Sequence, residues 1–277
     1  MKAFVFPGQG SQFPGMGYDL YKSNEKVKSL FSEADDILGF ALSNVMFNGT
    51  EEELKQTKIT QPAIFLHSIA ELIVLQETHL PNAVAGHSLG EFSSLVANNT
   101  ISFEDGLKLV FLRAKAMQKS CENSNGTMAA ILGLDDKIIK ETCESFDGNV
   151  TAANFNCPGQ VVISGELNAV KMICEKFNEI GARRSILLPV GGAFHSNLMN
   201  DAKSELKEAI HKTKFNNPTC PIYQNFTAQK TTSIDIIKEN LINQLTAPVL
   251  WTQTINNMVN DGYLDYTEVG PGKVLQG

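Results

Sequence analysis

Gly86-His87-Ser88-Leu89-Gly90 is the stretch of sequence that decides the fold. It follows a short apolar segment, 83–85, that predicts a small buried strand, and it leads into a predicted helix over 88–97. A Gly-x-Ser-x-Gly string between a strand and a helix is typical of a sharp turn that exposes a serine hydroxyl, with N–H groups at the helix start facing a developing oxyanion. The sequence therefore predicts an α/β protein with Ser88 as nucleophile. A tight glycine turn with an incidental serine is the alternative.

A serine nucleophile needs a base, because its hydroxyl reacts poorly until a neighbouring group takes the proton. Of the five histidines, His195 is best placed, since it directly precedes a predicted helix over 196–212 whose positive end favours a neutral imidazole. A helix-capping or packed histidine is the alternative interpretation. Of the other four, His67 is expected in a helix interior and His79 in a loop. His87 is beside the serine but is expected to point away from it, and His211 is late in a helix.

Arg113 is expected on the apolar face of a helix that begins after Ser102 and runs to about 120. Val110, Ala114 and Met117 surround it at helical spacing. A buried guanidinium needs an anionic partner, and arginine binds a carboxylate through two parallel hydrogen bonds. The sequence leaves two partners open, a protein carboxylate or the carboxylate of a ligand.

The segment 126–190 predicts a second, smaller unit inserted into the first. Its order is the ferredoxin-like one, strand, helix, strand, strand, helix, strand, over 127–132, 136–146, 150–156, 160–165, 167–180 and 184–188. Gly126 and Gly191-Gly192 flank it as flexible joints. We therefore predict a large catalytic subdomain over 1–125 and 191–277 and a small subdomain over 126–190. The large one has further strands over 2–6 and 266–269 and helices over 25–38, 61–75 and 234–245.

Composition excludes several classes of protein. The chain has 277 residues, 43% of them hydrophobic and 19% charged, which is ordinary for a globular enzyme. A net charge of -7 without a basic stripe argues against nucleic-acid binding. The longest apolar stretch, 64–75, is interrupted by His67 and Glu71, and the apolar N-terminal segment is too short for a secretory signal. Five scattered cysteines without metal-ligand or redox spacing indicate reduced thiols, no metal and a cytoplasmic location.

An ordered set of motifs along the whole chain resembles the malonyl-CoA:acyl carrier protein transacylase family. The resemblance implies an α/β-hydrolase-like large subdomain with a parallel sheet, an inserted ferredoxin-like small subdomain, and a site in the cleft between them. The motifs are, in chain order, Phe6-Pro7-Gly8-Gln9-Gly10-Ser11-Gln12, Gly86-His87-Ser88-Leu89-Gly90-Glu91, Arg113 with Met117-Gln118, Asn154-Phe155-Asn156-Cys157-Pro158-Gly159-Gln160, Phe194-His195-Ser196, Pro248-Val249-Leu250-Trp251 and Glu268-Val269-Gly270-Pro271-Gly272.

The same resemblance implies an activity and a set of residue roles. Ser88 would take the malonyl group from malonyl-CoA while His195 takes the proton, and the phosphopantetheine thiol of acyl carrier protein would then accept the group, supplying fatty acid synthesis. No cofactor or metal is expected, and the chain would act as a monomer. Further roles would be the N–H groups of Gln9 and Leu89 as oxyanion hole, substrate contacts from Arg113, Met117, Asn156, Phe194 and His87, and the Leu250 carbonyl orienting the imidazole. Phe194 would also crowd out an α-methyl group.

Two other functions share part of this pattern. A serine thioesterase or esterase would pass its acyl group to water and would place an acid such as Asp147 between serine and histidine in chain order. A catalytically silent module that binds acyl-CoA or a carrier protein would keep the fold without forming an adduct on Ser88. Because the carrier partner is acidic, docking would need a local basic patch on this acidic chain. Family members usually continue into a further helix beyond the Gly-Pro-Gly loop.

Overall fold

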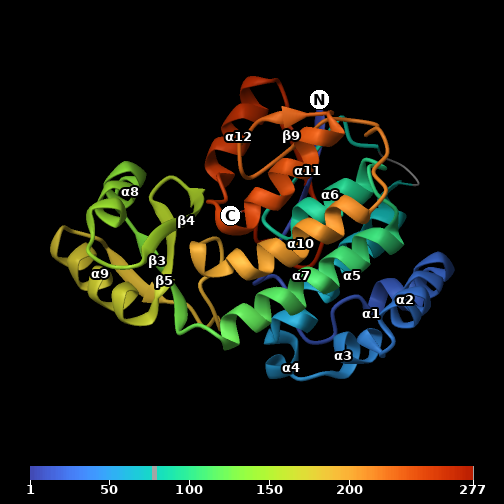
Figure 1. The fold of residues 1–277 in the computed structure, drawn as a ribbon. Coiled ribbons are helices and arrows are strands. Elements are labelled where there is room, and N and C mark those ends of the chain that lie inside the picture. The colour runs from blue at the N-terminus through green and yellow to red at the C-terminus, as the bar shows by residue number, and fades with distance from the viewer. Residues whose placement is uncertain (77–79, 277) are drawn as a thin grey trace.

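The computed structural model describes residues 1–76 and 80–276, which form two subdomains built on separate sheets (Figure 1). In these residues the large sheet has the strand order β8-β7-β2-β1-β9. The four strands β1, β2, β7 and β9 pair in parallel, and β8 pairs antiparallel with β7 at the edge. Their bounds are Lys2–Phe6 for β1, Ala83–Gly86 for β2, Ile222–Tyr223 for β7, Lys230–Thr231 for β8 and Asp265–Glu268 for β9.

The two central strands end at the same level of this sheet. Phe6 of β1 is paired with Gly86 of β2, so the loops that follow these strands begin side by side. Both strands are almost entirely buried, as expected for central strands of a parallel sheet covered by helices. This register brings the Pro7-Gly8-Gln9 loop next to the turn that carries Ser88.

Helices pack around the large sheet and form most of the core. The longest, α5 and α7, pack against each other, and α10 packs against α7. The bounds are Tyr18–Ser23 for α1, Glu25–Leu38 for α2, Leu42–Asn48 for α3, Glu51–Lys55 for α4, Thr57–Gln76 for α5, Gly90–Ala97 for α6, Phe103–Glu122 for α7, Asn200–Lys212 for α10, Ile234–Asn243 for α11 and Trp251–Asn260 for α12, with 3-10 turns at Asn197–Met199 and Gln244–Thr246.

Helix α5 is the one described helix that is long and apolar enough to cross a bilayer, by length and composition alone. Of its window Thr57–Leu75, 67% is buried inside the fold. Such burial is typical of the core helix of a globular domain. The expectation that this chain has no membrane-spanning segment stays a prediction.

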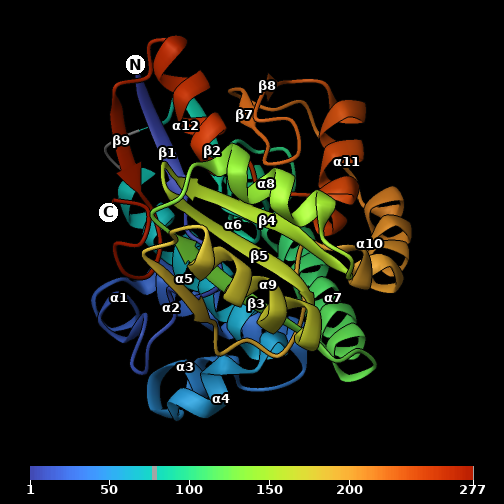
Figure 2. The same cartoon turned by 90° about the vertical axis from the view of Figure 1, so that its left-hand side faces the viewer.

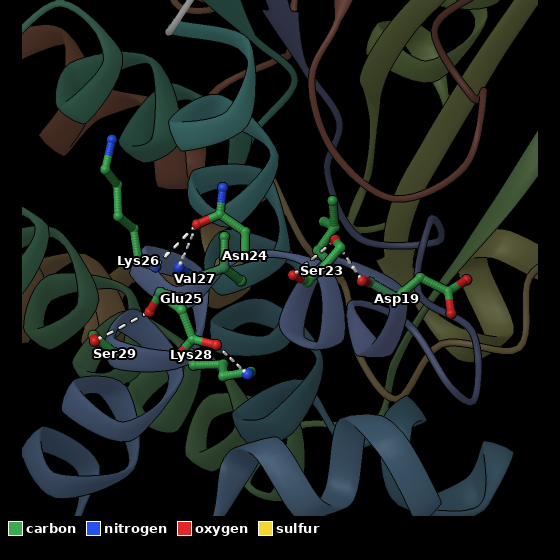
Figure 3. A network of polar contacts seen from close by, with 9 residues as sticks. Asp19, Ser23, Asn24, Glu25, Lys26, Val27, Lys28 and Ser29 are labelled. Atoms are coloured by element: carbon green, nitrogen blue, oxygen red, sulfur yellow. Dashed lines mark hydrogen bonds and ion pairs between the residues drawn. The ribbon is translucent and has the colours of Figure 1, made fainter.

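The boundaries of α2 illustrate how local residues set helix ends, and Figure 3 shows the first of these boundaries. The Asn24 side chain accepts hydrogen bonds from the N–H groups of Lys26 (2.9 Å) and Val27 (3.3 Å). At the other end, Gly39 adopts the left-handed conformation with φ 73° and closes the helix. A cap of the Asn24 kind contributes about 1 kcal/mol, and these caps explain why the helix spans the predicted range 25–38.

The small subdomain has the ferredoxin-like order that the sequence predicts (Figure 2). Its antiparallel sheet has the strand order β4-β5-β3-β6 and a core of its own that includes Ile131, Val161 and Phe177. The bounds are Gly126–Leu132 for β3, Asp136–Ser145 for α8, Val150–Cys157 for β4, Gln160–Glu166 for β5, Leu167–Glu179 for α9 and Arg184–Leu187 for β6.

Two of the glycines at the joints between the subdomains lie in tight contacts, and the flexibility expected of these joints stays a prediction. A Cβ on Gly126 would lie 2.8 Å from the Ala193 Cβ, and one on Gly192 would lie 2.0 Å from the Cys121 Sγ. A side chain at either position would force these neighbours to shift, whereas Gly191 has open space around it. Edge strand β4 adds a second connection, since Phe155 N–H donates to the Val249 carbonyl (2.9 Å) and Val249 N–H to the Ala153 carbonyl (2.8 Å).

Most predicted elements lie within a few residues of the observed ones. Helix α6 is an informative exception, because it begins at Gly90 and not at Ser88 as expected. Ser88 itself has a left-handed backbone, with φ 53°, and therefore cannot belong to the helix. The short elements α1, α3, α4, β7 and β8 were not predicted, since segments of two to seven residues carry too little periodicity. The ten-residue helix α12 was also not predicted.

Candidate active site

The turn at Ser88 depends on both glycines of the motif. A Cβ on Gly86 would lie 1.9 Å from the Gly90 carbonyl carbon, and one on Gly90 would lie 2.1 Å from the Phe6 carbonyl oxygen. Strand β2, helix α6 and strand β1 can approach this closely only without those side chains. The turn lifts Ser88 out of the sheet with φ 53°, a strained conformation for a residue with a Cβ.

Ser88 and His195, which are 107 residues apart, meet in this structure. The Ser88 Oγ lies 2.8 Å from His195 Nε2, and His195 Nδ1 lies 2.9 Å from the Gln244 carbonyl oxygen. A carbonyl can only accept, so Nδ1 carries the proton and Nε2 is left free to take one from the serine. This pair has the geometry of a nucleophile and its general base.

The expectation that the Leu250 carbonyl orients the imidazole is wrong. That carbonyl accepts the N–H of Thr254 (2.9 Å) in the first turn of α12, and the Leu250 N–H donates to the Asn225 carbonyl (3.1 Å). Both backbone groups of Leu250 are therefore committed elsewhere. The orienting carbonyl belongs to Gln244, in the 3-10 turn that follows α11.

Arg113 lies on α7 with only 1% of its surface exposed and points at the serine. Its Nη1 donates to Gln61 Oε1 (2.7 Å), and its Nη2 donates to Ser88 Oγ (3.0 Å) and to Gln244 Oε1 (3.2 Å). Its Nε has no hydrogen-bond partner among the described residues. The sequence left two partners open for Arg113, a protein carboxylate or a ligand carboxylate. Among the described residues, no protein carboxylate forms an ion pair with it.

Charge at the site follows from burial. Burial lowers the pKa of Arg113 to about 10, partly opposed by the negative charge of Glu91, so the guanidinium stays charged near neutral pH. Burial, reinforced by the Arg113 cation, lowers the pKa of His195 to about 3. A fixed cation beside a neutral imidazole is suited to binding an anionic substrate next to a general base.

A cavity of about 180 Å³ opens beside these groups, between the two subdomains. The small sheet contributes Met128, Asn154, Asn156 and Val162 to its lining, and the large subdomain contributes Gln61 and most of the predicted residues. His87 Nε2 lies 2.9 Å from Asn156 Oδ1, so the imidazole next to the nucleophile is held by the small subdomain. The predicted residues that line this cavity are Gln9, His87, Ser88, Leu89, Arg113, Met117, Asn156, Phe194 and His195.

Among the other histidines, His67 is buried in α5 and His211 lies in the last turn of α10, whereas His79 falls outside the described residues. Sequence reasoning missed two residues of the site, Gln61 and Gln244, that hold the arginine. A polar Gln61 in the apolar α5 was the one available signal. Gln244 has no recognisable motif around it.

Comparisons with known proteins add an independent observation. A family model described as an acyl transferase domain matches residues 3–277. A malonyl CoA-acyl carrier protein transacylase of Bacillus subtilis strain 168 is 44% identical over 279 residues, which cover 99% of this chain and 88% of that protein.

Solved structures agree with these sequence matches. An acyl carrier protein S-malonyltransferase from Vibrio cholerae has a TM-score of 0.96 and 41% identity, covering 100% of this chain and 92% of its own. A type II PKS acyl-carrier protein has been solved in complex with its malonyl-transacylase, and a chain of that complex has a TM-score of 0.96 and 39% identity, with 100% and 91% coverage.

Proposed function

The chain belongs to the acyl transferase family, among the malonyl CoA-acyl carrier protein transacylases, and we propose on that premise that it transfers a malonyl group from malonyl-CoA to the phosphopantetheine thiol of an acyl carrier protein. One observation carries the proposal. The Ser88 Oγ contacts both the His195 imidazole (2.8 Å) and the Arg113 guanidinium (3.0 Å), so a nucleophile, a base and a carboxylate-binding group meet at one point.

In the first half-reaction the serine becomes acylated. Arg113 binds the malonyl carboxylate, and the thioester carbonyl oxygen turns toward the N–H groups of Gln9 and Leu89. Ser88 Oγ attacks the carbonyl carbon as His195 Nε2 takes its proton. When the C–S bond breaks, the imidazolium returns that proton to the departing CoA sulfur.

In the second half-reaction the thiol of the carrier's phosphopantetheine group takes the place of CoA. His195 removes the thiol proton, the sulfur attacks the malonyl-serine ester, and the proton passes to Ser88 Oγ as the ester bond breaks. The free enzyme is restored, so the two half-reactions together form a ping-pong mechanism. Every proton is carried by His195, so the reaction that we propose requires neither a cofactor nor a metal.

A serine thioesterase is the second candidate, but the site favours it less. Such an enzyme would orient its histidine with an acid, and here the orienting group is the Gln244 carbonyl, whereas Asp147 lies in the turn between α8 and β4 of the small subdomain. Incubation with malonyl-CoA separates the two. A transferase accumulates malonyl-serine and releases malonate slowly until a carrier protein is added, whereas rapid malonate release without carrier would support the thioesterase.

We also propose that the protein acts in the cytoplasm as a monomer, on the basis of its scattered, unpaired cysteines and of a site supplied by a single chain. The basic patch expected for carrier docking stays a prediction. A groove of about 600 Å³ between α10 and α11 is lined by Lys203, Lys207, His211 and Lys238, but Asp235 and Glu239 line the same groove.

The low pKa of His195 predicts an unusual pH dependence. A general base must be unprotonated, and a pKa lowered from 6.5 to about 3 keeps the imidazole neutral well below pH 6.5. We expect kcat/KM for malonyl-CoA to stay level from about pH 8 down to about pH 5, with circular dichroism confirming that the fold persists. Loss of activity with a midpoint near pH 6.5 that also occurs in folded Glu91→Gln protein, which lacks the buried carboxyl whose pKa burial raises to about 7, would contradict the buried, neutral base.

Phe194→Ala is expected to relax acyl selectivity. The Phe194 ring is 6% exposed and lines the cavity directly before His195, so its removal opens space for a substituent at the malonyl α-carbon. A methyl clash of this kind discriminates by about 1 to 3 kcal/mol, so the ratio of malonyl to methylmalonyl transfer should fall on the order of 10- to 100-fold. Competition between the two CoA esters measures that ratio, and an unchanged ratio would remove Phe194 from the selectivity argument.

A further inference from the structure

The Ser88 peptide is held on both sides by amide side chains from distant parts of the chain. The Ser88 N–H donates to Asn225 Oδ1 (2.6 Å), and Asn225 Nδ2 donates to the Gly86 carbonyl (2.7 Å). On the other side, Gln244 Nε2 donates to the Ser88 carbonyl (2.9 Å). Asn225 therefore bridges the strand end and the nucleophile, from a position 137 residues away.

Asn225 is itself held by a buried carboxylate. Glu91, in the first turn of α6, has 0% of its surface exposed, and its Oε1 accepts the Asn225 N–H while its Oε2 accepts from Gln224 Nε2 (3.5 Å). A buried carboxylate needs such donors to offset its lost hydration. Burial raises the pKa of Glu91 to about 7, and the hydrogen bonds from Asn225, Gln244 and Gln224 oppose that rise.

This arrangement bears on the reaction in two ways. A left-handed backbone at a residue with a Cβ persists only where its surroundings over-determine it, and the Asn225 and Gln244 contacts do so at Ser88. In addition, the Ser88 N–H is occupied by Asn225, so it cannot face the thioester oxygen. The next N–H along the chain, that of Leu89, is left for the oxyanion.

We propose that Asn225 is a positioning residue for the nucleophile, and that Glu91 holds Asn225 in place. The inference rests on the proposed malonyl transfer and deepens it. Loss of Asn225 would free the Ser88 peptide to relax, which turns Oγ away from His195 and lets the Ser88 N–H compete for the oxyanion. Binding of malonyl-CoA through Arg113 would be little affected, because Arg113 makes no contact with Asn225.

The test compares Asn225→Ala with a matched variant, Asn98→Ala. Asn98 is equally buried, lies at the far end of α6, and donates through Nδ2 to the Cys220 carbonyl (3.1 Å), so its loss removes a similar buried bond without touching the elbow. Rapid-quench mass spectrometry would give the rate of Ser88 malonylation at saturating malonyl-CoA and the concentration that half-saturates it. Thermal melts would give the loss of stability.

We expect Asn225→Ala to slow malonylation about 100-fold with half-saturation changed less than about threefold, since displacement of a reacting group by an ångström costs about that much. Asn98→Ala should lower the melting temperature comparably and leave the rate within about twofold of the parent. A normal rate in folded Asn225→Ala, or equal slowing in both variants, would overturn the positioning role.

If Asn225→Ala does not fold, Glu91→Gln tests the positioning role of Asn225 instead. It keeps the shape of the side chain but turns an amide donor toward the donors of Gln224 and Gln244, and we expect malonylation to slow about tenfold with unchanged half-saturation. An unchanged rate would overturn the proposal. Absence of any malonyl adduct on the parent protein would instead overturn the proposed function, so the two failures are distinguishable.

Discussion

Ser88→Ala is expected to abolish the malonyl adduct and to lower malonyl transfer to acyl carrier protein at least about 10⁴-fold. The reason is chemical, since the variant retains the cavity, His195 and Arg113 but has no atom that can form the acyl bond. Intact-mass spectrometry after exposure to malonyl-CoA measures the adduct, and a carrier-dependent assay measures transfer. Malonyl-CoA binding should persist, because the carboxylate-binding guanidinium is unchanged.

Ser93→Ala is the matched control for this variant. Ser93 lies on α6 with 0% exposure, and its Oγ has no hydrogen-bond partner among the described residues. Removing it should leave both adduct and transfer at parental levels. An adduct that survives in Ser88→Ala, or one that maps to another residue, would contradict the assignment of the nucleophile.

Arg113→Ala is expected to separate malonyl transfer from transfer of an uncharged acyl group. Without the guanidinium, the malonyl carboxylate would be buried against Gln61 and Gln244 with no cation, which costs about 3 to 5 kcal/mol, or about 150-fold to 4,000-fold in kcat/KM. Acetyl transfer has no carboxylate to lose and should be unchanged or faster. Parallel assays with malonyl-CoA and acetyl-CoA measure this difference directly.

Arg113→Lys supplies the control for charge. A lysine retains the cation but lacks the planar fork that also reaches Gln61 and Gln244, so an intermediate malonyl rate is expected. Equal loss of malonyl and acetyl transfer in Arg113→Ala would mean that Arg113 supports the serine, through its 3.0 Å contact with Oγ, instead of reading the carboxylate.

Local patterns in the sequence determined much of this protein. Two glycines around Ser88 predict a tight turn because only a residue without a Cβ permits the approach of β1, β2 and α6, and the structure contains those contacts. The ferredoxin-like order of 126–190 and the range of α2 followed from periodicity, and the structure shows a cap at each end of α2. The position of Arg113 on an apolar helix face predicted a buried cation, and Arg113 is buried in the structure.

Only the tertiary structure decided which groups complete the site. His195 is oriented by the Gln244 carbonyl and not by that of Leu250. Every residue has a backbone carbonyl, so the side chains do not show which carbonyl will accept the bond. The position of the turn in the folded chain decides it. Asn225 is bonded to Ser88, which is 137 residues away in the sequence, and Gln61 is bonded to Arg113, which is 52 residues away. Hydrogen bonds over such separations have no periodicity, so local pattern predicts the elements and the nucleophile, whereas the partners of the nucleophile depend on how the elements pack.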